Sequence, residues 1–487
     1  MIVSIVIAVI VIYLAIDWLT QKPNNFPPGP PTLPLIGSLP FMPRKLVHYT
    51  MAGEWRKKYG PVIGCMLGSM RMVAICGPQE VLEVLRRDEF QGRPKGDFFK
   101  DRSFNKYLGV FFSDGPFWVE QRRFTLRHLR DFGFGKKSMQ DLIMDEVEDV
   151  IKEITKKETF QANGMFAVST LNVLWGMLAG TRYSRDDAEL KVLLKKLTRN
   201  FRAGNPAGGI TASLPIFKKL IPGIIGHTEA MESLRDMQSF FRKSIQNHKT
   251  TIDENYLRDF MDAYLKEMNI QETNPDTTFT EEGLITICLD LFAAGGETTT
   301  SSIEFTLMYM VLYPEVQKAV HKELDAVVGQ NRRPTLEDRP NLHYVEAVLT
   351  ELLRVCSIAP FTPPHRTTKD TQINGYSIPK NTSIAICIYS LFQDKEHWGD
   401  PEVFRPERFL NSEGKYVKDD WMIPFGAGKR VCLGEVLARS TVFLFFTTLL
   451  HEFIFSVPEG DPPPSEIPLS GFTIAPQPFR LKASKRF

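Results

Sequence analysis

Cys432 lies in the ten-residue string FGAGKRVCLG, residues 425–434, whose residue types and spacing suit a reactive thiolate. The apolar run GEVLARSTVFLFFTTLL follows the cysteine almost at once and has helical periodicity. The sulfur should therefore lie at a helix N-terminus, where free amide groups and the helix dipole favour an anion. We expect the pKa of the Cys432 thiol to be lowered there.

The neighbours of Cys432 add the features of a pocket for a large flat ligand. The three glycines of the string allow tight turns and close backbone approach. Phe425 can shield the sulfur from water, and Arg430 can pair with a carboxylate of the ligand. A buried structural cysteine is the commoner fate of a free cysteine, but it would not need these neighbours at fixed spacing. The string therefore favours a thiolate ligand.

The segment LDLFAAGGETTTSS, residues 289–302, is the second chemical signal. It lies inside a long helical pattern, where the adjacent Gly295 and Gly296 each weaken a helix by about 1 kcal/mol relative to alanine. The missing side chains would let the helix pass close over a flat ligand. Glu297 and Thr298 follow, and a carboxylate beside a hydroxyl can help to deliver protons. Alone, such a string is more often a plain helix distortion, so its weight depends on the other motifs.

Three further motifs accompany these two signals: W-x-x-x-R at 118–122, E-x-x-R at 351–354 and PERF at 406–409. In this order, and over nearly the whole chain, the motifs resemble those of the cytochromes P450, the haem-thiolate monooxygenases. The resemblance implies a bound haem b, iron protoporphyrin IX, with Cys432 as the iron ligand.

The resemblance also implies a role for each site residue. Thr298 and Glu297 would act in catalysis, in oxygen activation and proton delivery. Glu351, Arg354 and Arg408 would form a buried structural network. Contacts to the cofactor are implied for Trp118, Arg122, His365, Arg430, Phe425 and Gly434.

The implied activity is insertion of one atom of O2 into a small lipophilic substrate. The electrons would come from NADPH through NADPH-cytochrome P450 reductase, assisted in some family members by cytochrome b5. A basic cluster within 122–137 would be the docking surface for this acidic donor; it contains Arg122, Arg123, Arg127, Arg130, Lys136 and Lys137. The plain alternative for such a cluster is a solvated helix face.

The substrate is less well determined by the sequence. The segments GPFWVEQRRFTLRHLRDFGFG and LNVLWGMLAGTRYSRDDAE resemble insect microsomal members, especially those that epoxidise methyl farnesoate to juvenile hormone. Steroids, fatty acids and xenobiotics are alternative substrates. Two alternative functions are a haem-thiolate isomerase or dehydratase, which needs no reductase, and a non-catalytic haem sensor.

Composition excludes some classes of protein. The net charge of +2 over 487 residues gives no support for nucleic-acid binding. Six cysteines without paired or zinc-like spacing indicate a reducing compartment. A hydrophobic content of 43% is ample for a large core. No linker or repeat divides the chain beyond residue 40, so we predict one large domain, mostly α with a minor β-sheet.

The N-terminus predicts attachment to a membrane. Residues 1–20 begin with an almost wholly apolar run and form the expected anchor. Residues 21–35 contain the stiff, proline-rich sequence of a hinge, and residues 36–487 form the haem-binding catalytic domain. By resemblance, that domain faces the cytosol from the endoplasmic reticulum membrane. The apolar segment 201–226 would roof the substrate cavity and dip into the membrane.

Hydrophobic periodicity predicts the elements that must position these residues. Two strands are expected within 61–77, and extended stretches near 373–390 and 467–482. Helices are expected at 116–130, 138–155, 165–180, 187–200, 228–248, 254–268, 280–312, 314–328, 340–356 and 434–451.

Overall fold

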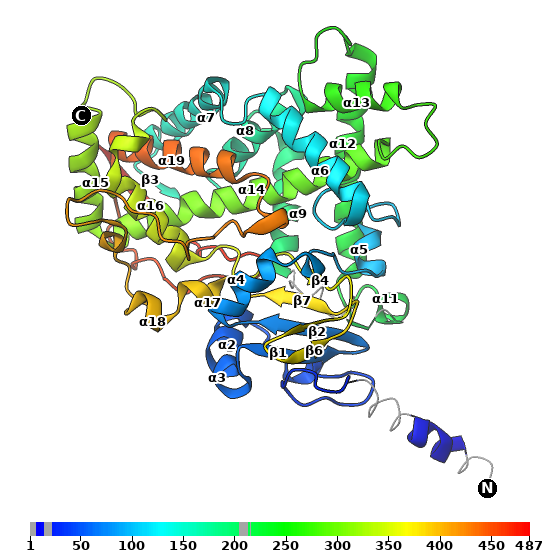
Figure 1. Ribbon diagram of the computed structural model, residues 1–487. Helices are drawn as coiled ribbons and strands as arrows, with labels where there is room; N and C mark the ends of the chain where they lie inside the picture. Colours follow the sequence, from blue (N-terminus) through cyan, green and yellow to red (C-terminus); the bar gives the residue numbers. More distant parts are fainter. Residues whose placement is uncertain (1–5, 14–21, 204–212, 215) are drawn as a thin grey trace.

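A computed structural model of the chain describes residues 6–13, 22–203, 213–214 and 216–487. Helices make up most of the described chain, and short strands form small sheets (Figure 1). The predicted architecture, mostly α with a minor β-sheet in one large domain, is confirmed.

The helix α14, Glu281–Leu312, runs across the centre of the body (Figure 1). It begins where it does because the Thr280 hydroxyl accepts the free N–H of Gly283 at 3.0 Å. Most of its length is buried, which explains why its apolar residues are spread around the helix instead of along one stripe. The helices that pack directly on it include α8 (Ala167–Ala179), α12 (His227–Thr251), α16 (His343–Cys356) and α19 (Glu435–Glu452).

Most predicted helices form within a few residues of their expected ends. The largest difference is at the start of α13, Phe260–Ile270, which we predicted to begin at residue 254. Its start is set by Asp259, whose carboxylate accepts the N–H of Asp262 as a helix cap. The other long helices are α6 (Gly115–Asp131), α7 (Lys137–Thr155), α9 (Ala188–Ala203) and α15 (Pro314–Val327). The shorter helices are α2 (Val47–Thr50), α3 (Arg56–Tyr59), α4 (Pro78–Arg86), α5 (Asp97–Asp101), α11 (Ile216–Leu220), α17 (Tyr389–Phe392) and α18 (Lys395–Trp398).

The largest sheet has four strands in the order β1-β2-β7-β4. The predicted hairpin near its edge is confirmed, with β1 (Val62–Leu67) antiparallel to β2 (Met70–Ile75). β7 (Ser383–Ile386) runs parallel to β2, and β4 (His365–Arg366) pairs with β7. This last pairing, with His365 opposite Ile384, fixes the position of the histidine that we expect at the cofactor. A separate hairpin joins β5 (Thr371–Ile373) to β6 (Tyr376–Ile378).

The prediction of an extended stretch over 467–482 is wrong for most of that length. Only its end enters a ladder, as β9, Arg480–Lys485. Pro476 and Pro478 have no N–H to donate and so keep the preceding residues out of a sheet. β9 pairs with two strands that we did not predict, β3 (Thr159–Gln161) and β8 (Phe453–Ser456).

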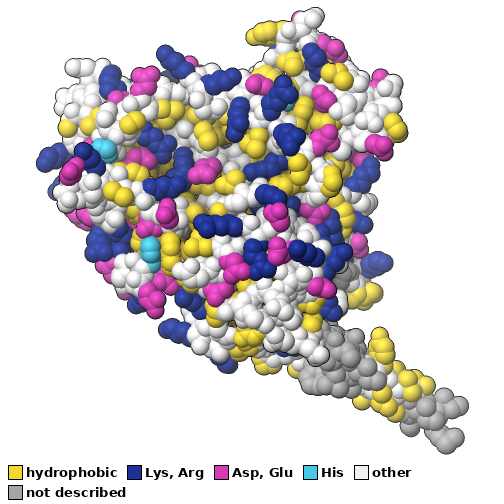
Figure 2. All heavy atoms as spheres, viewed as in Figure 1, with side chains coloured by type: hydrophobic (Ala, Val, Ile, Leu, Met, Phe, Trp, Pro, Cys, Tyr) yellow, Lys and Arg dark blue, Asp and Glu magenta, His cyan; other side chains and the backbone are white. Residues whose placement is uncertain are grey.

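The N-terminal segment projects from the body as a helix over residues 6–13 with exposed apolar side chains (Figures 1 and 2). The rest of the predicted anchor, 1–5 and 14–20, lies outside the described residues. Among the helices that the structure describes, none has the length and apolar content required to cross a bilayer. From residue 22 onward the predicted hinge lies against β1, where the N–H of Gly64 donates to the carbonyl of Pro28 at 2.8 Å.

The predicted roof segment, 201–226, is described only in part, because residues 204–212 and 215 lie outside the description. α9 brings Phe201 to this region. Beyond the gap, the short helix α11 and the turn after it expose three large apolar side chains to the surface: Ile216, Leu220 and Ile224.

A buried ionic network holds the segment that leads to the cysteine loop. Arg354 donates to both oxygens of Glu351, at 2.7 and 2.8 Å, and both side chains are fully buried. Arg408, in the PERF turn, donates to the same carboxylate at 3.1 Å. The remaining donors of the two arginines bind backbone carbonyls between 392 and 403, and Arg408 also pairs with the carboxylate of Asp400. The network thus ties α16 to this irregular segment.

Substitution of Glu351 should expose the dependence of the fold on this network. E351Q leaves the buried guanidinium of Arg354 without a counter-charge and removes one of the two carboxylates that bind Arg408, the other being Asp400. Breaking a buried pair typically costs about 3–5 kcal/mol. We expect a clear fall in the urea midpoint of unfolding, followed by tryptophan fluorescence. The matched control is E153Q, which breaks an exposed i,i+3 pair with Lys156 and should change stability by less than about 0.5 kcal/mol. Equal midpoints for the two variants would contradict the assignment.

Candidate functional site

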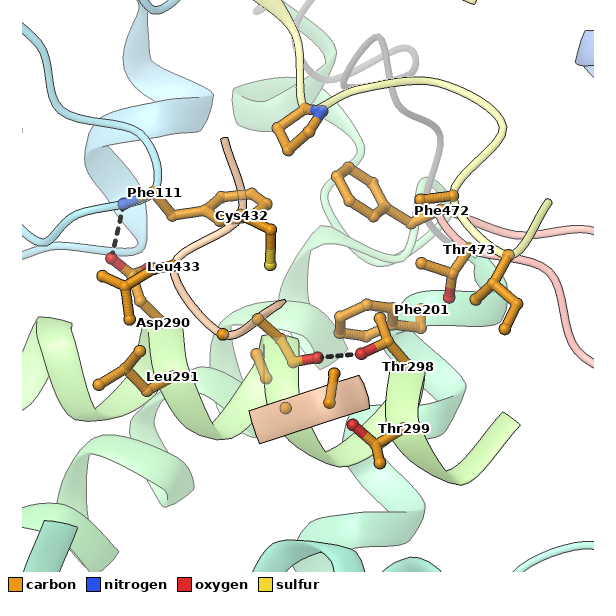
Figure 3. A pocket seen from close by; sticks show the side chains of 18 of the residues that line it. Phe111, Phe201, Asp290, Leu291, Thr298, Thr299, Cys432, Leu433, Phe472 and Thr473 are labelled. Atoms are coloured by element: carbon orange, nitrogen blue, oxygen red, sulfur yellow. Dashed lines mark hydrogen bonds between the residues drawn. The ribbon is translucent and has the colours of Figure 1, made fainter. Parts of the chain in front are cut away.

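A single cavity of about 1120 Å³ brings together most of the predicted site residues (Figure 3). Cys432 lines one side of it, and the α14 residues Ala294 and Thr298 line another. Trp118 and His365 line it as well, although they are distant in sequence. Of the nine predicted site residues, Glu297 alone is not among the lining residues.

The cysteine loop is shaped by its backbone. The N–H of Cys432 donates to the carbonyl of Phe425 at 2.9 Å, which closes the loop before α19 begins at Glu435. Gly428 has φ +69° and lies so close to α4 that a Cβ would be 2.3 Å from the carbonyl oxygen of Leu85. Only glycine fits there. At Gly434 a Cβ would meet nothing within 4 Å, because that side of the loop faces open space.

The ionisation of Cys432 differs from our expectation. Its side chain is open to the cavity but lies deep in the protein, and this burial raises the pKa of the thiol. The N–H of Gly434 and the charge of Arg122 act in the opposite direction but are outweighed. The predicted lowering of the pKa by the helix N-terminus is therefore wrong for the protein alone. A cation coordinated by the sulfur would stabilise the thiolate form of Cys432, as metal ions do for the thiols that bind them.

Three arginines gather at one edge of the cavity, which we call the basic edge: Arg93, Arg122 and Arg430. Arg430 lies 3.6 Å from the centre of the Trp118 ring and binds the carbonyls of Gln91 and Ser113. Arg122 binds the carbonyl of Val431 at 2.5 Å. The third, Arg93, is buried; sequence reasoning missed it, although an arginine between Gly92 and Pro94 was a weak signal of a fixed position.

The other two predicted residues at this edge are fixed by backbone carbonyls. His365 is buried, and its Nδ1 contacts the carbonyl of Phe90 at 2.8 Å. The indole N–H of Trp118 donates to the carbonyl of Val110 at 3.2 Å. Burial lowers the pKa of Arg430 to about 9, and it also lowers the pKa of His365 well below its usual value. The protein thus brings several basic groups into a place that disfavours positive charge.

This edge fits an anionic ligand. Among the described residues, no ion pair joins Arg93, Arg122 or Arg430 to a carboxylate. Asp114 attracts Arg430 from a distance, but its carboxylate is bound by Lys95 and Arg366. Nη1 of Arg430 is buried without any hydrogen-bond partner. Because a buried, unpaired cation is costly, the site suits a ligand with more than one carboxylate, as the two propionates of haem provide.

α14 passes over the cavity with its two glycines against other helices. A Cβ on Gly295 would be 2.7 Å from Leu174 of α8, and one on Gly296 would be 3.8 Å from Leu197 of α9. The close approach that we predicted at Gly295 and Gly296 therefore involves the neighbouring helices α8 and α9. Thr298 faces the cavity, and its hydroxyl donates to the carbonyl of Ala294 at 2.7 Å (Figure 3).

Glu297 points away from the cavity. Arg202 of α9 donates to one of its oxygens at 2.5 Å, and Thr198 donates to the other at 2.9 Å. Arg202 also donates to the carbonyl of Thr473 at 2.9 Å. In this conformation the carboxylate joins α14, α9 and the C-terminal turn, so its predicted part in proton delivery stays a prediction.

The basic cluster divides between the interior and the surface. Arg122 turns into the cavity, whereas its neighbour Arg123 is exposed. The turn after α6 lies beside the start of α19, since a Cβ on Gly135 would be 3.9 Å from Val436. The exposed members, on the same side of the protein as the cysteine loop, are Arg123, Arg127, Arg130, Lys136 and Lys137.

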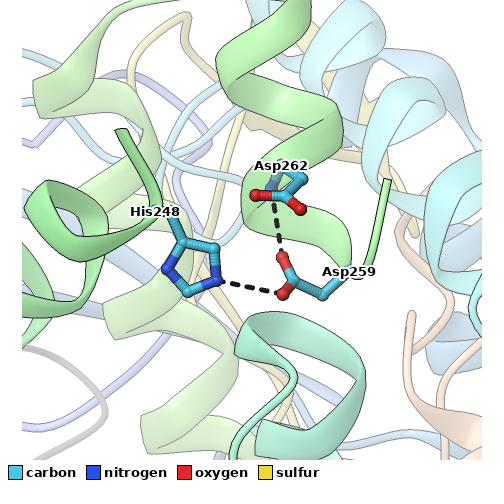
Figure 4. A group of neighbouring side chains, drawn as sticks. All are labelled: His248, Asp259 and Asp262. Atoms are coloured by element: carbon cyan, nitrogen blue, oxygen red, sulfur yellow. Dashed lines mark hydrogen bonds and ion pairs between the residues drawn. The ribbon is translucent and has the colours of Figure 1, made fainter. Parts of the chain in front are cut away.

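A second cluster, His248, Asp259 and Asp262, has the composition of a metal site (Figure 4). Its atoms are already engaged by protein groups. His248 contacts the carbonyl of Ser244 at 2.7 Å and Asp259 at 3.0 Å. Asp259 caps α13, and Asp262 accepts three bonds from Arg258. The cluster therefore joins the end of α12 to the start of α13 as a structural contact.

The His248–Asp259 pair predicts a pH-dependent contribution to stability. Burial alone would lower the pKa of His248, but Asp259 raises it overall above 6.5. The pair therefore makes its full contribution to the free energy of unfolding below about pH 6.5. This contribution is lost as pH rises through the higher pKa that His248 has in the folded state. The destabilisation caused by H248Q should be larger at about pH 6 than at about pH 8.5 in urea unfolding. H227Q, at the opposite end of α12, is the control, and an H248Q effect that does not shrink with pH would contradict the pairing.

Comparison with known proteins agrees with this geometry. The sequence profile of the cytochrome P450 family matches residues 27–483. The chain is 38% identical to "Farnesoate epoxidase" of Bombyx mori, over 94% of this chain and 93% of that protein. It is 34% identical to "Probable cytochrome P450 303a1" of Drosophila melanogaster, over 95% and 94%. It is 35% identical to "Cytochrome P450 2B2" of Rattus norvegicus, over 89% and 88%. A thiol and a basic edge in one cavity, together with these likenesses, place the chain in the cytochrome P450 family of haem-dependent monooxygenases.

Proposed function

We propose that the chain binds haem b in the large cavity, with Cys432 as the iron ligand and the basic edge around the propionates. The observation that carries this proposal is the gathering of Arg93, which is buried, and of Arg122 and Arg430, which are partly buried, at one edge of the cavity without a carboxylate to balance them. Trp118 and His365 complete this edge. Gly434 leaves open space beside Cys432, and Phe425 covers the loop.

The bound haem would supply the oxygen chemistry, and the chain would supply binding, orientation and protons. Thr298 has a hydroxyl on the cavity wall, where it can hold or pass a proton near the reacting atoms. Its bond to the Ala294 carbonyl fixes the direction of that hydroxyl. Glu297, one residue away, is proposed as the proton source after its carboxylate leaves Arg202. Apolar side chains around the cavity exclude water and hold the substrate.

The electrons are proposed to come from NADPH through NADPH-cytochrome P450 reductase. The exposed basic cluster supports this proposal because it lies on the same side of the protein as the cysteine loop, where an acidic donor would be nearest to Cys432. We also propose that the chain resides at the endoplasmic reticulum membrane. The exposed apolar side chains of residues 6–13 and of the α11 region support this location.

Methyl farnesoate is the substrate that we propose, with epoxidation as the reaction. The cavity wall is rich in aromatic and aliphatic side chains, which suits a slender isoprenoid chain. The relative from Bombyx mori named "Farnesoate epoxidase" supports a sesquiterpenoid. The other relatives have names that specify no substrate, so the monooxygenase proposal does not depend on this choice.

Arg430 should be required for retention of haem. R430Q removes a charged donor whose Nη1 has no partner in the protein. A charge-assisted hydrogen bond contributes about 1.5–3 kcal/mol, so haem should transfer to excess apomyoglobin at least about tenfold faster. The control is K429Q, which alters an adjacent residue on the surface, paired with Asp88. Unchanged haem loss in R430Q would contradict the assignment of the basic edge.

The substrate proposal is tested by incubating the full-length protein with the reductase, NADPH and methyl farnesoate. We expect an epoxide, identified by mass spectrometry, whose formation needs both NADPH and the reductase. C432S should abolish it because the iron ligand is lost. A panel of steroids and fatty acids is assayed in parallel. Turnover of the panel without any epoxide would reject methyl farnesoate, and rearrangement of a peroxide without NADPH would instead indicate an isomerase.

A further inference from the structure

An ion pair lies in the wall of the same cavity, across the Val110–Phe111 backbone from Arg93 and Trp118 of the basic edge. Nη2 of Arg102 donates to Oδ1 of Asp290 at 2.5 Å, and both residues line the cavity. The side chain of Asp290 is 1% exposed and that of Arg102 is 18% exposed. An ion pair so well removed from water in an otherwise apolar wall needs a reason, because burying it gives little net stability.

The carboxylate of Asp290 is held by the loop that carries the aromatic wall. Its Oδ2 accepts the N–H groups of Val110 and Phe111, at 2.7 and 3.0 Å (Figure 3). Gly109 lets the loop approach, since it has φ +78° and a Cβ there would be 2.3 Å from Oδ2. Asp290 therefore has a fixed position.

Arg102 uses fewer of its hydrogen-bonding groups than Asp290 does. Nη1 is buried and has no hydrogen-bond partner, and the guanidinium lies 5.2 Å from the centre of the Phe112 ring. Asp290 is the one carboxylate paired with Arg102 among the described residues. The adjacent Asp101 is itself paired with Lys218, so it adds no net charge to this wall.

The pair has a direct consequence for the substrate. A lipophilic carboxylate in this part of the cavity would lose its hydration and find no free cation, since the charge of Arg102 is already matched. A neutral ester loses much less hydration. We propose that Asp290 neutralises Arg102 and thereby makes the cavity select neutral lipophilic esters over the corresponding acids. Resting on the function proposed above, this inference assigns the substrate as the methyl ester and not the farnesoate anion.

The test measures binding of two pairs of ligands, methyl laurate with lauric acid and methyl farnesoate with farnesoic acid. Dissociation constants are obtained by equilibrium dialysis with the haem-loaded protein at neutral pH, where both acids are ionised. The variants are D290N, R102Q and the double variant R102Q/D290N. E282Q is the matched control, because Glu282 lies on α14 like Asp290 and pairs with Lys106 in the segment of Arg102, while neither residue lines the cavity.

Wild type should bind each ester at least about tenfold more tightly than its acid. D290N leaves Arg102 uncompensated and should raise the affinity for both acids by at least about tenfold, with little change for the esters. R102Q/D290N should lose that gain, because no net charge remains. R102Q should bind acids no better than wild type, and E282Q should keep the wild-type ratio of acid to ester affinity.

Equal or tighter binding of the acids by wild type would overturn the inference. So would a folded D290N with an unchanged ratio of acid to ester affinity. If D290N does not fold, a gain in acid affinity in R102Q overturns the inference, and its absence together with the wild-type preference supports it. The laurate pair separates this result from the proposed function: selection of methyl laurate without any epoxide from methyl farnesoate would reject the sesquiterpenoid and leave the charge selection standing.

Discussion

The folded chain buries positive charge beside a thiol without providing negative charge to balance it. Arg93, Arg122 and Arg430 meet at one edge of a large apolar cavity, and Cys432 opens into the same space. Desolvation lowers the pKa values of all three arginines and raises that of the thiol, so the surroundings disfavour the charged form of each group. A ligand that brings both a cation to the sulfur and carboxylates to the arginines would relieve both penalties at once, as haem does. Loading of the cofactor should therefore be closely linked to the stability of this part of the fold.

Two carboxylates of α14 that line or border the cavity are each paired with an arginine. Asp290 pairs with Arg102, and Glu297 pairs with Arg202. The two carboxylates lie on α14 but join it to different segments. Asp290 holds the loop with Phe111, whereas Glu297 holds α9 and, through Arg202, the C-terminal turn. α14 is thus the common support of the Phe111 loop and of α9.

Much of the fold could be predicted from the sequence. Long helices with regular apolar spacing, such as α6 and α7, formed close to their predicted ends because their periodicity is a local property of the sequence. The prediction was wrong where a distant partner decides the structure. Residues 467–479 have strand-like composition, but they form no strand; their one bridge is between Leu469 and Ala475, and Pro476 and Pro478 follow it directly. β3 and β8 are too short to be recognised without β9, with which they pair.

Local motifs are enough to indicate the family and its chemistry. Cys432 and its loop, the glycine-rich segment of α14 and the E-x-x-R and PERF motifs are all patterns of fixed spacing along the chain. Eight of the nine site residues predicted from the sequence line the cavity. Only the tertiary structure showed that Arg93 joins the basic edge, that Glu297 faces α9 and that Arg102 is neutralised by Asp290. These facts depend on which charges meet after burial. Pairing and desolvation act between segments far apart in the chain, and no local pattern records them.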